Sequence, residues 1–145
     1  KGAAATLCAA LPGMVARNRG HIVGVSSLAR HRGLPQYAAY AASKAFLSSF
    51  LESLRIDLHD SKVDVTCLQP GFVKTAMTER NKFYMPFLMD LEEGVEQMAS
   101  AIVRREREHS FPWQMEGAVG ILKSLPNAVF DRMGAKMRSR REDAS

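Results

Sequence analysis

The sequence predicts an α/β fold built around a parallel sheet. Three observations predict it: helix-like and strand-like segments alternate, the strand-like segments are almost continuously apolar, and small or polar residues follow each of them. A near-continuous apolar strand is typical of a sheet that helices cover on both faces. The alternating order indicates strands that run parallel to one another.

Composition places the chain among ordinary globular proteins. Of its 145 residues, 46% are hydrophobic and 24% are charged, which excludes disordered and fibrous classes. No apolar run approaches the roughly 20 residues that a membrane-spanning helix needs. Cys8 and Cys67 stand alone and the four histidines are scattered, so we expect no metal site. We expect both cysteines to be small buried side chains in a reducing, cytoplasmic compartment.

The first helix and the first strand meet at a turn. Residues 1–17 are rich in alanine and end at Asn18-Arg19-Gly20, where the glycine can adopt the left-handed conformation that ends helices. Residues 21–25 are rich in β-branched side chains and predict a strand. Ser26 and Ser27 follow this strand directly. Ligands of open α/β sheets bind beyond the carboxyl ends of the strands, so both serines are candidate site residues.

A helix over residues 37–59 follows a loop over residues 28–36. Its bulky apolar residues recur at helical spacing. Tyr40 and Lys44 are four residues apart, which places a phenol and an ammonium on one face of the helix. A free phenol ionises near pH 10, and an ammonium about 4 Å away favours its ionisation by on the order of 4 kcal/mol. The two residues therefore predict proton transfer to a carbonyl or from an alcohol.

The second strand is predicted over residues 63–68. It ends at Gln69-Pro70-Gly71, because proline cannot donate to a sheet ladder. Residues 72–89 show no regular pattern, which is typical of a lid or a binding loop. Two strands do not form a stable sheet, so we expect partner strands upstream of residue 1.

Two further helical regions follow. Asp90 and Glu93 resemble a capping box at the start of a helix that runs through about residue 106. Residues 115–137 predict one or two helices divided at Pro126. The C-terminal basic residues lie beside an apolar stripe, which suits either peripheral membrane contact or, as we favour, a packed helix with a solvated basic face. No interleaved aromatic residues support nucleic-acid binding.

Five stretches of the sequence, in order, resemble the short-chain dehydrogenase/reductase family. They are Gly20-His21-Ile22-Val23-Gly24-Val25-Ser26-Ser27, Gly33-Leu34-Pro35, Tyr40-Ala41-Ala42-Ser43-Lys44-Ala45, Ser53-Leu54-Arg55 and Pro70-Gly71-Phe72-Val73-Lys74-Thr75. The resemblance covers about residues 1–77 and continues more loosely to the C-terminus.

This resemblance implies the C-terminal part of a Rossmann-like, doubly wound parallel sheet in three αβα layers. The sheet would be incomplete in this chain, because the family's Gly-rich phosphate loop has no match here. Residues 1–145 would form a single partial domain. Residues from about 108 to 145 would be a C-terminal extension on the substrate side, with a basic tail.

The resemblance also implies three catalytic residues. Ser27 would orient the substrate, Tyr40 would be the acid/base, and Lys44 would activate Tyr40 and bind the nicotinamide ribose. The cofactor would be NAD(P), with NADP slightly favoured, and the substrate would be a small, apolar carbonyl or alcohol. The implied cofactor-binding residues are Tyr40, Lys44, Pro70, Gly71, Val73 and Thr75, and the implied substrate-binding residues are Ser27, Leu28, Phe72, Met77 and Phe83.

Two functions remain open. The resemblance implies a parent protein that is an NAD(P)-dependent oxidoreductase and interconverts a carbonyl and an alcohol by hydride transfer, although this chain alone is expected to be inactive. The alternative is a truncated, non-catalytic fragment that acts only as an association module. In the family, the helices that correspond to residues 1–17 and 37–59 commonly pair in a dimer interface, so we expect a homodimer or a tetramer.

Overall fold

The computed structural model describes residues 2–76, 78–79 and 84–142. The elements follow one another in the order α1 (Gly2–Ala16), β1 (Gly20–Val25), the 3-10 helix η1 (Leu28–His31), α2 (Ala38–Asp57), β2 (Val63–Pro70), α3 (Leu91–Val103), β3 (Glu108–Phe111), α4 (Trp113–Ser124) and α5 (Asn127–Glu142). The predicted division of the C-terminal region at Pro126 is confirmed, because Pro126 separates α4 from α5.

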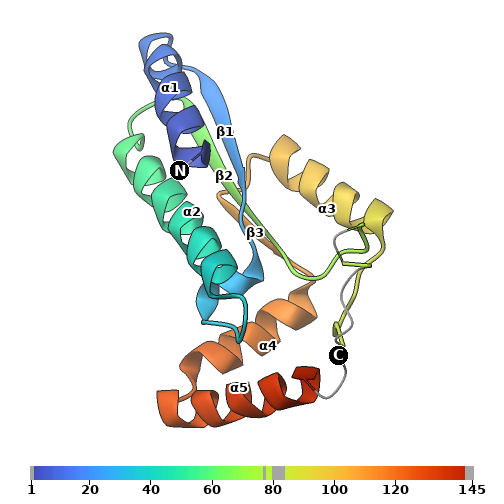
Figure 1. The fold of residues 1–145 in the computed structure, drawn as a ribbon. Helices are drawn as coiled ribbons and strands as arrows, with labels where there is room; N and C mark the ends of the chain where they lie inside the picture. The colour runs from blue at the N-terminus through green and yellow to red at the C-terminus, as the bar shows by residue number, and fades with distance from the viewer. Residues whose placement is uncertain (1, 77, 80–83, 143–145) are drawn as a thin grey trace.

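The three strands form a parallel sheet in the order β1-β2-β3. Ile22 of β1 pairs with Val65 of β2, and Leu68 of β2 pairs with His109 of β3. Helices α1 and α2 lie on one side of the sheet and α3 lies on the other, while α4 and α5 lie beyond the carboxyl ends of the strands (Figure 1). This arrangement confirms the predicted α/β layering around a parallel sheet.

The hydrophobic core lies between α2 and the sheet. Leu51 and Leu54 of α2 and Leu58, which directly follows it, are at most 9% exposed and pack against apolar residues of β1 and β2. Burial of each leucine stabilises the fold by about 1.5–3 kcal/mol relative to an exposed position. Gly24 permits this close approach, because an added Cβ would lie 2.4 Å from Leu51 Cδ1. The helical periodicity of residues 37–59 therefore predicted the buried face of α2.

Strand β3 was not predicted from the sequence. Its four residues are mostly polar and show neither a continuous apolar run nor a regular alternation. Pairing with β2 sets its conformation: the Cys67 N–H donates to the Arg107 carbonyl (3.0 Å), and the Gly71 N–H donates to the Phe111 carbonyl (2.7 Å). The described sheet thus gains a third strand from residues that follow β2 in the chain.

Three local predictions were wrong. Asn18 (φ 46°) and not Gly20 has the left-handed conformation after α1, because no described glycine has a positive φ. Cys8 lies in α1, in which no residue is buried, and is exposed, whereas Cys67 is buried as expected. Helix α3 begins directly after Asp90, but the Asp90 side chain makes no capping hydrogen bond. Its carboxylate instead pairs with the Lys74 ammonium at 2.5 Å. An ion pair outside the helix has replaced the cap that the sequence pattern indicated.

Candidate active site

The candidate site lies at the carboxyl ends of β1 and β2. The Ser26 N–H donates to the Leu68 carbonyl (2.8 Å), which continues the pairing of the two strands beyond Val25. Parallel strands bring their carboxyl ends to one edge of a sheet, so the residues that follow β1 and β2 meet there. Ser27, two residues after β1, and Pro70, the last residue of β2, are in direct contact at this edge.

Two hydrogen bonds fix the Ser27 hydroxyl. Its oxygen accepts from the Ala29 N–H (3.1 Å), which caps η1, and its O–H donates to the Pro70 carbonyl (3.3 Å). A hydroxyl has one proton to donate, so a hydrogen bond to a substrate oxygen would replace the bond to the Pro70 carbonyl. In this structure Ser27 is only 7% exposed, and its proton is used by the Pro70 carbonyl.

Tyr40 and Lys44 share one face of α2, as their four-residue spacing predicted. Lys44 Nζ lies 5.6 Å from the centroid of the Tyr40 ring, which is within the range of a cation–π contact. The same ammonium donates to the Val25 carbonyl at the end of β1 (2.9 Å). Tyr40 is 40% exposed. The Tyr40 side chain is therefore partly accessible to solvent.

A pair of buried serines ties α2 to β1. Ser26 Oγ donates to the Lys44 carbonyl (2.9 Å), and Ser48 Oγ donates to Ser26 Oγ (2.7 Å). Both serines are buried. Ser48 was not predicted as a site residue, and its only sequence signal is the four-residue spacing from Lys44. Together the two serines set how closely the Lys44 turn of α2 approaches the end of β1.

The loop after β2 begins at Gly71. An added Cβ there would lie 2.6 Å from Met115 Sδ and 3.3 Å from the Phe111 carbonyl oxygen, so glycine is the residue that fits. Val73 forms an isolated bridge with Met89, and the Val73 side chain lies against Gly94 of α3. Contacts with β3, α3 and α4 therefore hold the start of this loop.

Thr78 organises the next part of the loop. The Thr75 N–H donates to Thr78 Oγ1 (2.7 Å), and the Thr78 hydroxyl donates to the Val73 carbonyl (2.8 Å). Thr78 was not predicted from the sequence. Two threonines three residues apart are only a weak signal of local side-chain to backbone bonding. Thr78 thus bonds to the backbone of Val73 and Thr75, two of the residues that were expected to bind the cofactor.

The residues predicted to bind substrate lie in different environments. Ser27 is at the sheet edge, as described above. Leu28 is 2% exposed and packs inside the described structure, while Phe72 is half-buried. Met77 and Phe83 lie outside the described residues. The structure therefore brings Ser27 to the site edge but leaves the Leu28 side chain in the interior.

The C-terminal helices enclose the segment that follows Ser27. The Arg32 guanidinium lies over the Phe130 ring of α5, 4.1 Å from its centroid. Burial lowers the pKa of His31, and the positive charges of Arg30 and of Lys123 on α4 lower it further. Helix η1 and the residue after it are thus held between the sheet edge and the two C-terminal helices.

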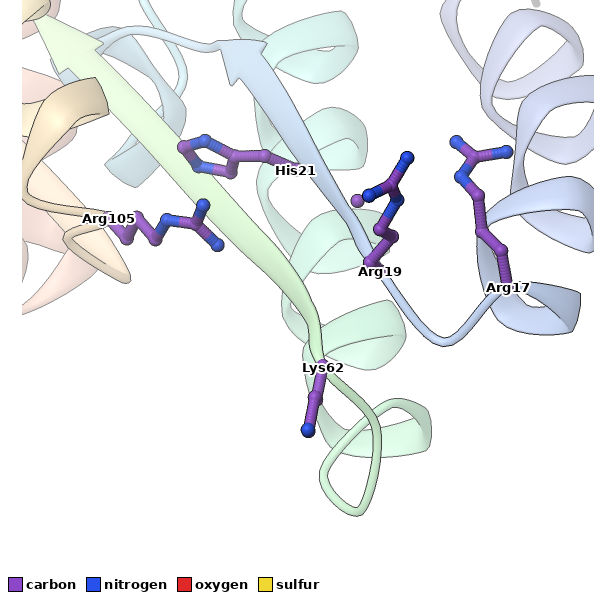
Figure 2. Close-up of a pocket in the computed structure, with 6 residues that line it drawn as sticks. Arg17, Arg19, His21, Lys62 and Arg105 are labelled. Carbon is purple, nitrogen blue, oxygen red and sulfur yellow. The ribbon is translucent and has the colours of Figure 1, made fainter.

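Two hollows in the described part of the chain lie elsewhere. One, of about 400 Å³, lies at the amino ends of β1 and β2, opposite Ser27. The other, of about 390 Å³, is lined by residues before and within α3, in β3 and at the start of α4. In the first, Lys62 points away from His21 and Arg105 (Figure 2), and Arg105 pairs with Asp64. Its lining residues are Arg17, Arg19, Gly20, His21, Lys62 and Arg105.

Metal-binding clusters and membrane-spanning helices are absent from the residues that the structure describes. No group of three histidine, cysteine, aspartate or glutamate side chains there could hold a metal ion. Within the same ranges, no helix has the length and apolar character needed to cross a bilayer.

Comparison with known proteins places this geometry in a family. The family model described as short chain dehydrogenase matches residues 1–83. The chain belongs to the short-chain dehydrogenase family. A protein of Myxococcus xanthus described as an uncharacterized oxidoreductase is 57% identical to this short-chain dehydrogenase chain over 137 residues. The match covers 94% of the chain and 54% of the relative, so the chain spans about half the relative's length.

Solved short-chain dehydrogenases share the fold. One from Burkholderia cenocepacia, in complex with NADP, has a TM-score of 0.67 and 26% identity, covering 83% of this chain and 49% of its own. One from Sphingobium yanoikuyae, in complex with NADPH, has a TM-score of 0.61 and 25% identity, covering 81% and 50%. The three strands and their helices are therefore part of a Rossmann-like fold, about half the length of these structures.

Proposed function

We propose that the protein to which this short-chain dehydrogenase chain belongs is an NAD(P)-dependent oxidoreductase that interconverts a carbonyl and an alcohol. One observation carries the proposal: Ser27 and Lys44 are bonded to the ends of neighbouring strands, and Lys44 lies beside the Tyr40 ring. A proton donor and a hydrogen-bond donor at one sheet edge suit a reacting carbonyl oxygen. Family membership supports the same class of reaction.

Tyr40 is the proton donor or acceptor in this proposal. The Lys44 ammonium lies near its ring and stabilises negative charge that develops on the phenol oxygen as the proton leaves. The Ser27 O–H turns from the Pro70 carbonyl to the substrate oxygen and orients it. Proton transfer by a positioned side chain contributes about 10² to 10⁴ in rate. We expect the substrate to be small and apolar.

A nicotinamide nucleotide fits the donors at this edge. When bound, NAD(P) supplies or accepts the hydride. The bond to the Val25 carbonyl uses one of the three N–H donors of Lys44, and the others suit ribose hydroxyls. Pro70, Gly71, Val73 and Thr75 would line the nicotinamide side. The solved relatives in complex with NADP and NADPH support this class of cofactor, and we favour NADP slightly.

The decisive experiment is Tyr40→Phe in the full natural protein that contains this chain. We expect kcat to fall by about 10² to 10⁴, because the proton donor is lost while the ring remains. The measurement is nicotinamide absorbance with a panel of small apolar carbonyls and alcohols. Ser53→Ala is the control on the same helix, because it also removes one hydroxyl, and Ser53 is exposed and bonds within α2. Full activity in Tyr40→Phe would remove Tyr40 from the mechanism.

A second candidate function is self-association through α1 and α2. It is supported by the exposure of these helices: no residue of α1 is buried, and Phe46 and Ile56 of α2 are 51% and 67% exposed. Apolar helix faces of this kind suit packing against a second copy. Sedimentation of residues 1–145 distinguishes the two functions. A folded dimer that binds no cofactor favours an association module, and aggregation favours a fragment of the enzyme.

A further inference from the structure

Gln69 is a fully buried amide beside the candidate active site. It lies in β2, one residue before Pro70, and is 0% exposed. Its Oε1 accepts from Arg30 Nε (2.9 Å) and from Ser110 Oγ (3.1 Å), while its Nε2 donates to Glu108 Oε2 (3.2 Å). Two donors face one end of the amide and a carboxylate faces the other, so its orientation is defined.

Arg30 closes this group of residues. Its guanidinium also donates to Glu108 Oε2 (3.4 Å), so Arg30, Gln69 and Glu108 bond to one another in a ring that we call the clamp. The three residues come from η1, β2 and β3 respectively. Ser27 caps the start of η1, and the Arg30 N–H donates to the Ser27 carbonyl (3.1 Å). The clamp therefore holds the far end of the short segment that Ser27 begins.

A second line of contacts runs from Gln69 toward α2. Gln69 Nε2 lies 3.7 Å from Cys67 Sγ, which lies 3.7 Å from Ser48 Oγ. Ser48 donates to Ser26, which donates to the Lys44 carbonyl, as described above. Sulfur is a weak hydrogen-bond partner, so this line is softer than the clamp. Gln69 therefore contacts the segment that carries Ser27 directly, and it reaches the residues that seat Lys44 only through Cys67.

We propose that Gln69, with Arg30 and Glu108, is a positioning residue that sets where the Ser27 hydroxyl stands relative to Tyr40 and Lys44. The inference rests on the proposed function for its effect on rate. A buried polar group is costly when unpaired, and fully paired it selects one geometry. An error of about 1 Å in the placement of a reacting group can cost about 10² in rate. Ser27 and Tyr40 come from separate elements, which the clamp and the serine pair connect.

A reciprocal exchange tests the clamp. Gln69→Glu sets a second carboxylate against Glu108, whereas Gln69→Glu with Glu108→Gln restores one carboxylate, one amide and two acceptors for Arg30. We expect Gln69→Glu to lower kcat by about 10- to 100-fold in the full natural protein, with KM within about 3-fold, because orientation rather than binding is lost. The double variant should recover most of kcat. Wild-type kcat in Gln69→Glu, or no recovery in the double variant, overturns the proposal.

Amide hydrogen exchange at Ala29 and Arg30 measures how stably η1 is bonded to Ser27, and it needs no turnover assay. Both N–H groups donate to Ser27. We expect their exchange to quicken by about 10-fold or more in Gln69→Glu, since these bonds open more often, and to return to the wild-type rate in the double variant. Unchanged exchange overturns the proposal. If the wild-type protein transfers no hydride while exchange responds as expected, the proposed function fails and the clamp stands.

Arg30→Met provides a second variant should Gln69→Glu fail to fold. The charge that loses its partner is that of Glu108, which is 38% exposed and also pairs with Arg55, so the variant leaves no fully buried charge. Ser110→Ala is the matched control, because it removes one donor to Gln69 Oε1 without touching η1. We expect Arg30→Met to lower kcat and quicken Ala29 exchange by about 10-fold or more, and Ser110→Ala to change both by less than about 3-fold. Equal effects of the two variants overturn the proposal.

Discussion

The two ends of the sheet hold polar side chains in different ways. At the carboxyl end, Ser27 and Lys44 are each bonded to a main-chain carbonyl of another element. At the amino end, Arg17, Arg19 and Lys62 line a hollow of about 400 Å³ and do not converge with Arg105, which pairs with Asp64 (Figure 2). Catalysis needs groups that are oriented before the reaction begins. The candidate active site is therefore indicated better by side chains that hydrogen bonds hold to a second element than by the size or the charge of a hollow.

The largest expected effect compares one lysine from each end. Lys44→Met removes the charge beside Tyr40 and the bond to Val25, and we expect it to lower kcat by about 10² or more. Lys62→Met removes a charge from the amino-end hollow, and we expect it to change kcat by less than about 2-fold. Initial rates followed by nicotinamide absorbance measure both. Equal losses in the two variants would contradict the distinction between the ends.

A glycine substitution tests how tightly the carboxyl end is packed. We expect Gly71→Ala to lower the free energy of unfolding by about 1–3 kcal/mol, because its Cβ would crowd Met115 and Phe111. Gly117→Ala, in α4, meets nothing within 4 Å and should raise it by up to about 1 kcal/mol. Urea unfolding measures both. A Gly71→Ala protein that is more stable than the wild type would show that this edge is loosely packed.

The buried serine pair gives a smaller effect. Ser48→Ala removes the hydrogen bond to Ser26, and we expect the free energy of unfolding to fall by about 1 kcal/mol. Ser53→Ala is the control on the same helix, because Ser53 is exposed and bonds only within α2. Its effect should stay within about 0.5 kcal/mol. Matching values for the two serines would show that the Ser26 contact adds nothing to the docking of α2.

The smallest expected effect concerns pH. The pKa of His31 is lowered in the fold, first by burial and then by Arg30 and Lys123, with Glu108 opposing them. The unfolded chain therefore binds a proton more readily, so stability rises with pH through the window below about 6.5. We expect His31→Asn to flatten that part of the profile of unfolding free energy against pH. A profile of unchanged slope would exclude His31 as its source.

Local chemistry explains why part of the site was predictable. Tyr40 and Lys44 share a face because four residues make about one helical turn, and Ser27 follows β1 because an apolar run has a visible end. The positions of Tyr40 and Lys44 near a helix start, and of Ser27 after a strand end, could be predicted from residues nearby in the sequence. The predictions for Cys8 and for the Asp90 cap were wrong, because burial and ion pairing depend on residues that are distant in the sequence.

By itself, the sequence determined the α/β class, the elements that carry Ser27, Tyr40 and Lys44, and the break at Pro126. Only the tertiary structure decided that the polar segment Glu108–Phe111 is a strand, and that Arg30 and Glu108 meet Gln69. Those contacts join residues 39 positions apart in the chain. Periodicity describes one element at a time, whereas hydrogen bonds between elements form only once the chain has brought their ends together.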